Sequence, residues 1–372
     1  MVIDFDKISK ISGLTIAEAE MRYNGWRERK KNSIVDHKLI ALMSNVSPAT
    51  VSNYFNGKNG AVSKKKGLII QTIIDYLGYI PDSAAKRLRS DKKMCIAYIA
   101  PISNSCSSEY YLDILKGLKK EAARKSYFID VYDIDEDQDK NFLDTFPFLG
   151  LVDGIVLASS KITSSELIPV NKRNIPVYLI NPKEEERKKP FVGSLCSDTN
   201  DFVFLLDHLF KERKFQNPAL VSVPTNGFSQ RIEKHFLFKK KMLDYGINFN
   251  EHQNIFLVES YALEEGRNVF SRIMENNSNV DAIITLSDII AVPILREIEK
   301  KGKNIAITGY GNFTIAPIFD LTTIDQKIQE LGKKAAFNLL KAIEYIDMNN
   351  EFPPYKKEIL KGSFVQRLSS EK

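Results

Sequence analysis

The sequence lacks the features that mark several large classes of protein. No apolar run approaches the roughly 18 residues of a membrane span, and the first ten residues lack the apolar core of a signal peptide. The three cysteines, Cys95, Cys106 and Cys196, have no CxxC spacing, and the four histidines have no metal-ligand spacing. There is no P-loop and no GxGxxG motif. We therefore expect a cytoplasmic protein that is not an enzyme and that carries no metal or cofactor.

One acidic stretch has a superficial likeness to a calcium loop. Asp133, Asp135 and Asp137 alternate as calcium ligands do. The pattern fails at its sixth position, where Gln138 replaces glycine, and at its twelfth, where Asp144 replaces the bidentate glutamate. These residues are predicted to form a solvated loop.

The net positive charge lies in the first quarter of the chain. Residues 1–93 hold 17 Lys+Arg and 9 Asp+Glu, a net +8, whereas the remaining 36 basic (53 − 17) and 38 acidic (47 − 9) residues give −2. A basic head on a near-neutral body suits phosphate binding, although a solubilising terminus would give the same count. At 372 residues the chain has room for a small domain and a larger two-lobed body.

Residues 36–55 have the pattern of two short helices joined by a tight turn. Leu39, Ile40 and Met43 form an apolar stripe, and residues 44–46 make the turn. Ser47 is a good N-cap, and the next residue is a proline, which suits the first helical position of a helix over 48–55. That helix presents small or hydrogen-bonding side chains that can approach base edges, namely Ser47, Pro48, Ala49, Thr50, Ser52, Asn53 and Asn56.

A third helix and a short basic segment follow. Ser63 caps the third helix, which ends at Gly78 and is predicted to bury Leu68, Ile69, Ile73 and Leu77. Lysines crowd its N-terminus, where the helix dipole disfavours cations, so a nearby phosphate would explain Lys64 and Lys65. Residues 83–88 form a helix too short to be stable alone, and they carry Lys86, Arg87 and Leu88.

The motifs VSPATVS (46–52), NG (56–57), VS (62–63), LGYIP (77–81) and AKRL (85–88) resemble the head and hinge of the lactose-repressor (LacI/GalR) family of transcription regulators. The resemblance implies that the second helix enters the DNA major groove and that Leu88 wedges into the minor groove. The family usually has arginine where this chain has Asn53. Arginine prefers guanine and asparagine prefers adenine, so we expect an altered operator.

The N-terminus contains a faint copy of the same pattern, shifted by 32 residues. Residues 7–25 align with residues 39–57, and Ile8, Leu14 and Ala19 overlie Ile40, Val46 and Val51. The copy could be a second DNA reader or a helical pair that packs on the true head. We favour the helical pair, because Glu18 and Glu20 fall on the would-be recognition helix and would repel phosphate.

From residue 94 onward, short apolar strands alternate with amphipathic helices. Strands are predicted at 95–100, 128–132, 154–158, 177–180, 219–223, 255–258, 282–286 and 305–308. Two such runs indicate two lobes with parallel sheets, and ligands of such folds bind at the carboxyl ends of the strands, between the lobes.

This body also resembles the sugar-binding-protein-like core of the same family, in motifs such as VDGIVLASS (152–160), IPVYLIN (175–181) and AIITLSDIIAVPIL (282–295). The resemblance implies effector contacts from Ser103, Ser160, Asn181, Asp198, Arg231, Lys234, Ser287, Asp288, Gly311 and Gln326. Lys234 replaces the arginine that usually grips the ligand, and lysine cannot reproduce a bidentate fork. Gly311 stands where a carboxylate is common. We expect a ligand other than a standard hexose, or a pocket that is weak or lost.

The sequence therefore predicts an α + α/β protein. It would have a helical extension (1–34), a helix-turn-helix head (35–80), a hinge helix and linker (81–93) and a two-lobed α/β body (94–372) like periplasmic binding proteins. We expect lobe 1 at about 94–182 and 322–347, and lobe 2 at about 183–321 and 348–372. The predicted function is that of a homodimeric repressor that binds a near-palindromic double-stranded operator. A small molecule, a sugar or a related metabolite, would bind between the two lobes and control it. A cytoplasmic metabolite-binding protein without a DNA role, or a regulator that has lost its response, is the alternative.

Overall fold

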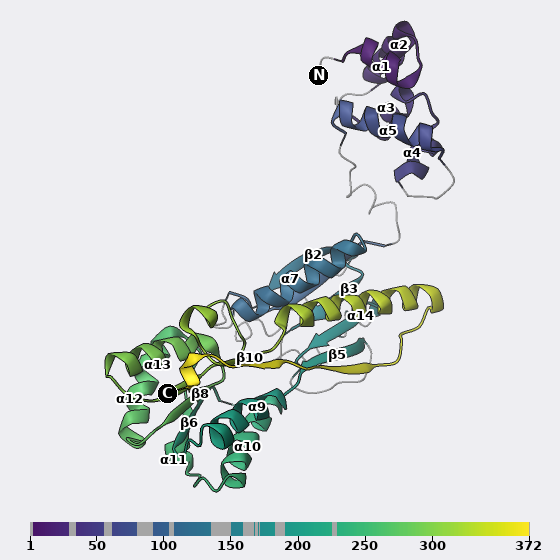
Figure 1. The fold of residues 1–372 in the computed structure, drawn as a ribbon. Coiled ribbons are helices and arrows are strands. Elements are labelled where there is room, and N and C mark those ends of the chain that lie inside the picture. Colours follow the sequence, from purple (N-terminus) through teal and green to yellow (C-terminus); the bar gives the residue numbers. More distant parts are fainter. Residues whose placement is uncertain are drawn as a thin grey trace. The chain divides into compact units, whose positions relative to one another are not determined.

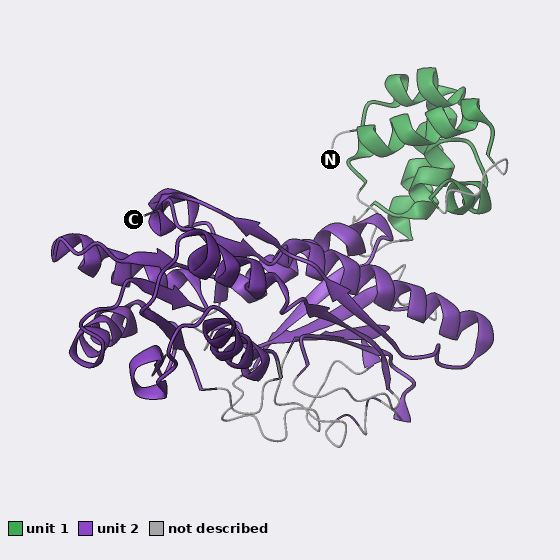
Figure 2. Cartoon of the chain, turned by 60° about the horizontal axis from the view of Figure 1, so that its bottom comes forward, with its two compact units in different colours: residues 1–90 green, residues 91–372 purple. Residues whose placement is uncertain are grey.

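The computed structural model describes residues 3–29, 35–55, 62–79, 92–103, 108–134, 150–158, 167, 170, 172–182, 190–224 and 229–371. The chain forms two compact units, residues 1–90 and residues 91–372 (Figure 2). Within these described residues, no helix is both long and apolar enough to cross a membrane. The finer division of the first unit at residues 34 and 80 stays a prediction.

The first unit is built of short helices around one core. Its described helices are α1 (Phe5–Ser12), α2 (Ile16–Glu28), α3 (His37–Met43), α4 (Pro48–Phe55) and α5 (Lys64–Leu77). Capping residues fix their ends: Asp36 accepts a hydrogen bond from the Leu39 N–H, and Gly78 adopts the left-handed conformation (φ 61°) that ends α5. The shared core contains Ile8, Leu14, Ala19, Trp26, Leu39, Ile40, Met43, Val51, Ile70, Ile73, Ile74 and Leu77.

The buried face of α5 agrees with the prediction at Ile73 and Leu77 but not at Leu68. Leu68 is 70% exposed, whereas Ile70 is fully buried. Three apolar residues in succession at 68–70 allow two different helical stripes, and hydrophobic period alone does not choose between them. The contacts of α5 with α1 and α3 select the stripe of Ile70, Ile73, Ile74 and Leu77.

The second unit contains a six-stranded and a four-stranded parallel sheet. The first sheet has the order β11-β5-β4-β3-β1-β2, and the second has the order β7-β6-β8-β9. Their strands are β1 (Cys95–Ala100), β2 (Phe128–Asp133), β3 (Gly154–Leu157), β4 (Val177–Ile180), β5 (Phe191–Ser197), β6 (Pro218–Ser222), β7 (Ile255–Leu257), β8 (Ala282–Thr285), β9 (Ala306–Thr308) and β11 (Lys356–Leu360).

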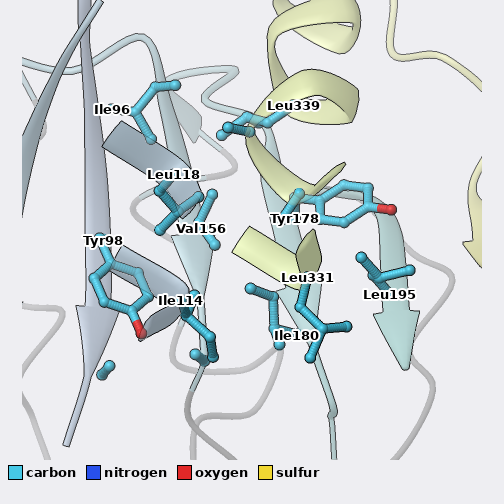
Figure 3. Packing of buried hydrophobic residues seen from close by; sticks show 14 of the residues in the cluster. Ile96, Tyr98, Ile114, Leu118, Val156, Tyr178, Ile180, Leu195, Leu331 and Leu339 are labelled. Atoms are coloured by element: carbon cyan, nitrogen blue, oxygen red, sulfur yellow. The ribbon is translucent and has the colours of Figure 1, made fainter. Parts of the chain in front are cut away.

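The core of the first lobe lies between its sheet and two long helices. α7 (Ser108–Arg124) and α14 (Ile328–Asn349) lie side by side on one face of the six-stranded sheet (Figure 1). Ile96, Tyr98, Val156 and Tyr178 point from the strands towards these helices, where Leu331 and Leu339 meet them (Figure 3). The alternate strand residues line a separate cluster on the opposite face. Burial of both faces explains why the inner strands β1, β3 and β4 read as continuous apolar runs.

The four-stranded sheet is also covered on both faces. α12 (Leu263–Asn276) and α13 (Asp288–Lys300) share one apolar cluster with Ala219 and Val221. The alternate residue Leu220 belongs to a second cluster with α9 (Asp201–Asp207), a π-helical turn (His208–Glu212) and α10 (Ser229–Asp244). The short helix α11 (Glu251–Asn254) precedes β7.

The chain passes between the two lobes more than once, and this changes the lobe boundaries that we expected. β5 pairs with β4, and β11 pairs with β5, so both strands belong to the first sheet although their ranges were assigned to lobe 2. β10 (Thr323–Asp325) and β12 (Ser363–Val365) pair antiparallel. The C-terminal 3-10 turn (Leu368–Ser370) returns to the second lobe, where the Ser369 hydroxyl donates to the Ile307 carbonyl.

Candidate DNA-reading surface and effector cleft

The helix α4 has the form of a DNA-reading helix. It begins at Pro48, and the Ser47 hydroxyl caps it by accepting the Thr50 N–H at 3.1 Å. Val51, on the inner face of α4, is fully buried and anchors that face of the helix. Ser47, Pro48, Ala49 and Ser52 are exposed, and Thr50 and Asn53 are partly exposed. A row of small polar side chains on an anchored helix suits contact with base edges.

The other predicted DNA contacts divide into two sets. Lys64 and Lys65 are exposed in the first turn of α5, which begins directly after its cap Ser63. The predicted contacts Asn56, Lys86, Arg87 and Leu88 lie outside the described residues.

The N-terminal copy of the motif does pack on the head. α2 contacts α3, and α1 contacts α5. The starts of the two helices show the same offset of 32 residues. α2 begins at Ile16 with Thr15 as its cap, and α4 begins at Pro48 with Ser47 as its cap. The predicted packing of residues 7–25 on the head is confirmed, and their role stays a prediction.

Between the two lobes, Asn181 is the centre of a hydrogen-bond network. Its Nδ2 donates to the Tyr110 hydroxyl (2.6 Å) and to Ser197 Oγ (3.3 Å). Its Oδ1 accepts the Ser197 N–H (2.8 Å) and Gln230 Nε2 (2.7 Å). Gln230 lies on α10 of the second lobe, so this contact joins the lobes. All four hydrogen-bonding positions of the Asn181 amide are therefore occupied by protein groups.

A second contact joins the lobes on the side of α7. Glu109 Oε1 accepts both the backbone N–H of Thr314 (2.9 Å) and the Thr314 hydroxyl (2.6 Å). Glu109 lies in the first turn of α7 in the first lobe, whereas Thr314 follows β9 in the second.

Lys234 is a buried lysine in the second lobe. The residue is 8% exposed, and its ammonium lies 3.9 Å from the centre of the Tyr310 ring. Burial, with repulsion from Arg231, lowers the pKa of Lys234 to about 7, against the opposing attraction of Glu233 and Asp201. Among the described residues, no carboxylate forms an ion pair with this ammonium.

Asp288 is occupied by structural contacts. It is fully buried at the start of α13, after the cap Ser287. Its Oδ1 accepts the Thr323 hydroxyl (2.6 Å), and its Oδ2 accepts the Phe313 N–H (2.7 Å). Burial raises its pKa to about 6, although these hydrogen bonds oppose the rise. A side chain at Gly309 would place its Cβ 2.0 Å from Asp288 Oδ1, which explains glycine there.

The remaining predicted effector contacts are more scattered. The Ser103 N–H donates to Oδ1 of Asp133, the first aspartate of the stretch that resembles a calcium loop. Asp198 Oδ1 accepts from Asn200, and Arg231 Nη1 donates to the Pro224 carbonyl at 3.1 Å. Gln326 is partly exposed, Gly311 has φ 131°, and Ser160 lies outside the described residues.

Sequence reasoning missed four side chains that join the lobes or contact predicted effector residues, namely Glu109, Tyr110, Gln230 and Tyr310. Nothing in the local sequence marks Tyr110 or Gln230 as partners of Asn181, because the three are separated by 71 and 49 residues.

A helix-turn-helix head with an exposed second helix, carried on a body of two parallel-sheet lobes, defines a DNA-binding transcriptional regulator. Residues 38–82 match the family described as "Bacterial regulatory proteins, lacI family", and residues 206–370 match the "Periplasmic binding protein-like domain". The chain belongs to the LacI family of transcriptional regulators. The lacI family match begins at residue 38, so α1 and α2, which end at Ser12 and Glu28, both lie outside it.

Curated relatives and solved structures agree with this assignment. The chain is 26% identical to the NTD biosynthesis operon regulator NtdR of Bacillus subtilis, over 82% of this chain and 91% of the relative. It is 24% identical to catabolite control protein A of Priestia megaterium, over 80% and 89%. The same fold occurs in the lac repressor dimer bound to operator and the anti-inducer ONPF (TM-score 0.69, 20% identity, 91% of this chain and 99% of that chain). It also occurs in a LacI family regulator from Enterococcus faecium with bound ribose (TM-score 0.63, 20% identity, 74% and 98%).

Proposed function

We propose that this protein acts in the cytoplasm as a homodimeric repressor that binds a near-palindromic operator through α4 and has no catalytic activity. The observation that carries the proposal is α4 itself, with a buried inner face and an outer face of small polar side chains. Relatives named as repressors support the direction of control, among them the sucrose operon repressor of Staphylococcus xylosus. The lac repressor dimer bound to operator supports the dimer.

We further propose that the effector is a small metabolite with a carboxylate or phosphate group. Related structures hold ribose or cellobiose, which are neutral sugars. Here Lys234 is a buried ammonium without an ion-pair partner among the described residues, and Arg231 lies one helical turn before it. A buried charge is costly unless it is paired. A ligand anion would supply the missing partner and raise the pKa of Lys234 again.

The two contacts between the lobes give a route from ligand to DNA. Gln230 with Asn181, and Thr314 with Glu109, hold the lobes in one relative position. A ligand that competes for these groups changes lobe closure, and the change in DNA affinity then follows from thermodynamic linkage.

Selection from random DNA tests the regulator function. The full-length protein is incubated with a library of random duplexes, bound DNA is amplified, and affinity for the enriched duplex is measured by gel shift at several salt concentrations. We expect an enriched near-palindrome whose affinity falls steeply with salt, as phosphate contacts require. Failure to enrich any sequence would contradict the DNA-binding role and favour the metabolite-binding alternative.

One observation favours a second candidate, a regulator that has lost its small-molecule response. Asn181 and Asp288, two predicted effector contacts, are fully engaged with protein groups. Calorimetry with ribose 5-phosphate and glucuronate as anionic probes, and ribose and cellobiose as neutral probes, separates the cases. We expect an anionic probe to bind the wild type and to lose affinity in Lys234→Met. If neither anionic probe binds, the anionic-effector proposal fails. If none of the four binds, the second candidate is favoured.

A further inference from the structure

The N-terminal helical pair, α1 and α2, contacts both ends of α3. This helix is the first of the three helices α3, α4 and α5 that form the DNA reader. At the start of α3, Trp26 Nε1 donates to Asp36 Oδ1 at 3.0 Å. The same oxygen accepts the Leu39 N–H at 2.9 Å, so Trp26 holds the capping residue in place. Trp26 is 5% exposed and belongs to the shared core.

At the other end of α3, Arg22 reaches the turn that leads into α4. Its Nη1 donates to the Leu42 carbonyl at 3.2 Å and to Asn45 Oδ1 at 3.0 Å. Leu42 lies in the last turn of α3, where carbonyls lack partners within the helix. Asn45 is the turn residue with positive φ (52°), so its conformation sets the direction in which the chain enters α4.

α5, the third helix of the reader, is held as well. The Asp4 N–H donates to the Tyr76 hydroxyl at 2.6 Å, and the Lys7 ammonium lies 4.9 Å from the Tyr76 ring centre. In the described part of the chain, the main helix–helix contact of α4 is with α3. The extension thus grips the two supporting helices and the turn, and leaves the reading surface exposed.

We propose that residues 3–29 are a brace for DNA recognition, in which Arg22 is a positioning residue that sets α4 through Asn45. This inference rests on the DNA-binding function and goes beyond it, because it makes operator affinity depend on a side chain outside the reader. A second reader in these residues is disfavoured, since Thr15 and Glu18 are joined in a capping box at the start of α2.

The test compares two arginines of the same helix in the full-length protein. Arg22→Ala removes the contact with the turn. Arg27→Ala removes the same charge from an exposed position of α2 and is the matched control. Arg22→Lys keeps the charge and a donor. Each variant is titrated with the duplex that the wild type selects from random DNA and with an unrelated duplex.

We expect Arg22→Ala to bind the selected duplex about tenfold more weakly, the effect of losing a hydrogen bond to a charged group. Binding to the unrelated duplex and the salt slope stay unchanged, and Arg22→Lys recovers part of the affinity. Arg27→Ala stays within about twofold, as expected for an exposed substitution. If Arg22 contacted a DNA phosphate, Arg22→Ala would instead weaken binding to both duplexes and lower the salt slope by about one.

The fluorescence of Trp26 distinguishes an effect on the position of α4 from a loss of folding. Trp26 is the only tryptophan in the chain, and it lies where α2 meets α3. All titrations are run where Trp26 emission is native for every variant. A loss of affinity that tracks changed emission, a loss shared equally with Arg27→Ala, or wild-type affinity in Arg22→Ala would each overturn the inference. A wild type that selects no sequence would overturn the DNA-binding function, and this inference with it.

Discussion

The buried Lys234 makes the stability of the second unit depend on pH in a definite direction. The perturbation is Lys234→Met, which keeps an unbranched stem in the same space and removes the charge. Unfolded lysine has a pKa near 10.5, and burial lowers the folded pKa to about 7. Between these values the unfolded chain binds a proton that the folded protein does not.

The sign and size follow from this difference. Above pH 10.5 the side chain is neutral in both states and costs nothing. As the pH falls from 10.5 to about 7, the free energy of unfolding falls by about 1.4 kcal/mol per pH unit, or ~5 kcal/mol over 10.5 − 7 = 3.5 units as an upper value. Below pH 7 the lysine is charged in both states, and the penalty stays constant.

The assay is urea unfolding of wild type, Lys234→Met and the matched control Lys240→Met, at pH values from about 7.5 to 9.5. Lys240 is exposed on the same helix. Circular dichroism follows the whole chain, and Trp26 emission follows the first unit alone. Over this window, the stability difference between Lys234→Met and wild type should grow by about 2–3 kcal/mol towards lower pH, with the variant the more stable.

Parallel pH curves for wild type and Lys234→Met would refute the reasoning, because the ammonium would then be as well solvated in the fold as in the unfolded chain. So would a variant that is less stable than wild type at pH 7.5. A saturating anionic ligand should reduce the difference, since it pairs the charge.

Two further predictions concern packing, and both are checked by the free energy of unfolding. Gly117→Ala should destabilise the second unit by about 1–3 kcal/mol, because its Cβ would lie 1.9 Å from the Gln329 carbonyl oxygen of α14 and the helices must separate. The same change at Gly67 meets only the Tyr54 ring at 3.5 Å, so Gly67→Ala should be neutral or stabilise by up to about 1 kcal/mol; equal losses at the two glycines would contradict this account. In α5, Ile70→Ala should cost about 2–5 kcal/mol and Leu68→Ala less than about 0.5 kcal/mol, and the reverse order would favour the face predicted from sequence.

The reader could be predicted from sequence because local signals agree there. Ser47, Pro48 and the apolar stripe each mark the same helix start, and α4 has the bounds that they predict. The same agreement placed β1 and β4, where apolar runs end sharply at turns. The structure of a segment can be predicted from its sequence where its capping residues, hydrophobic period and turn residues agree.

Segments whose structure depends on distant partners were not predicted. β11 (Lys356–Leu360) is mostly polar, and it is a strand because it pairs with β5 about 160 residues earlier. Asn181 illustrates the same limit in the cleft: its place in the sequence indicated a ligand contact, but Tyr110 and Gln230 already occupy its amide. Partners so far apart leave no mark on the local pattern.

The return of the chain to its earlier lobes has a consequence for the order of folding during synthesis. Thr322, between β9 and β10, donates its hydroxyl to the Arg367 carbonyl, and Ser369 bonds to both Thr322 and Ile307. Neither sheet lobe is therefore complete until residues 356–370 have emerged, whereas the first unit is complete by residue 90. Domains fold as units from the N-terminus during translation. A nascent chain would thus carry a finished DNA reader while its body still exposes unpaired strands, so early folding of the head and late closure of the lobes are separate events on the ribosome.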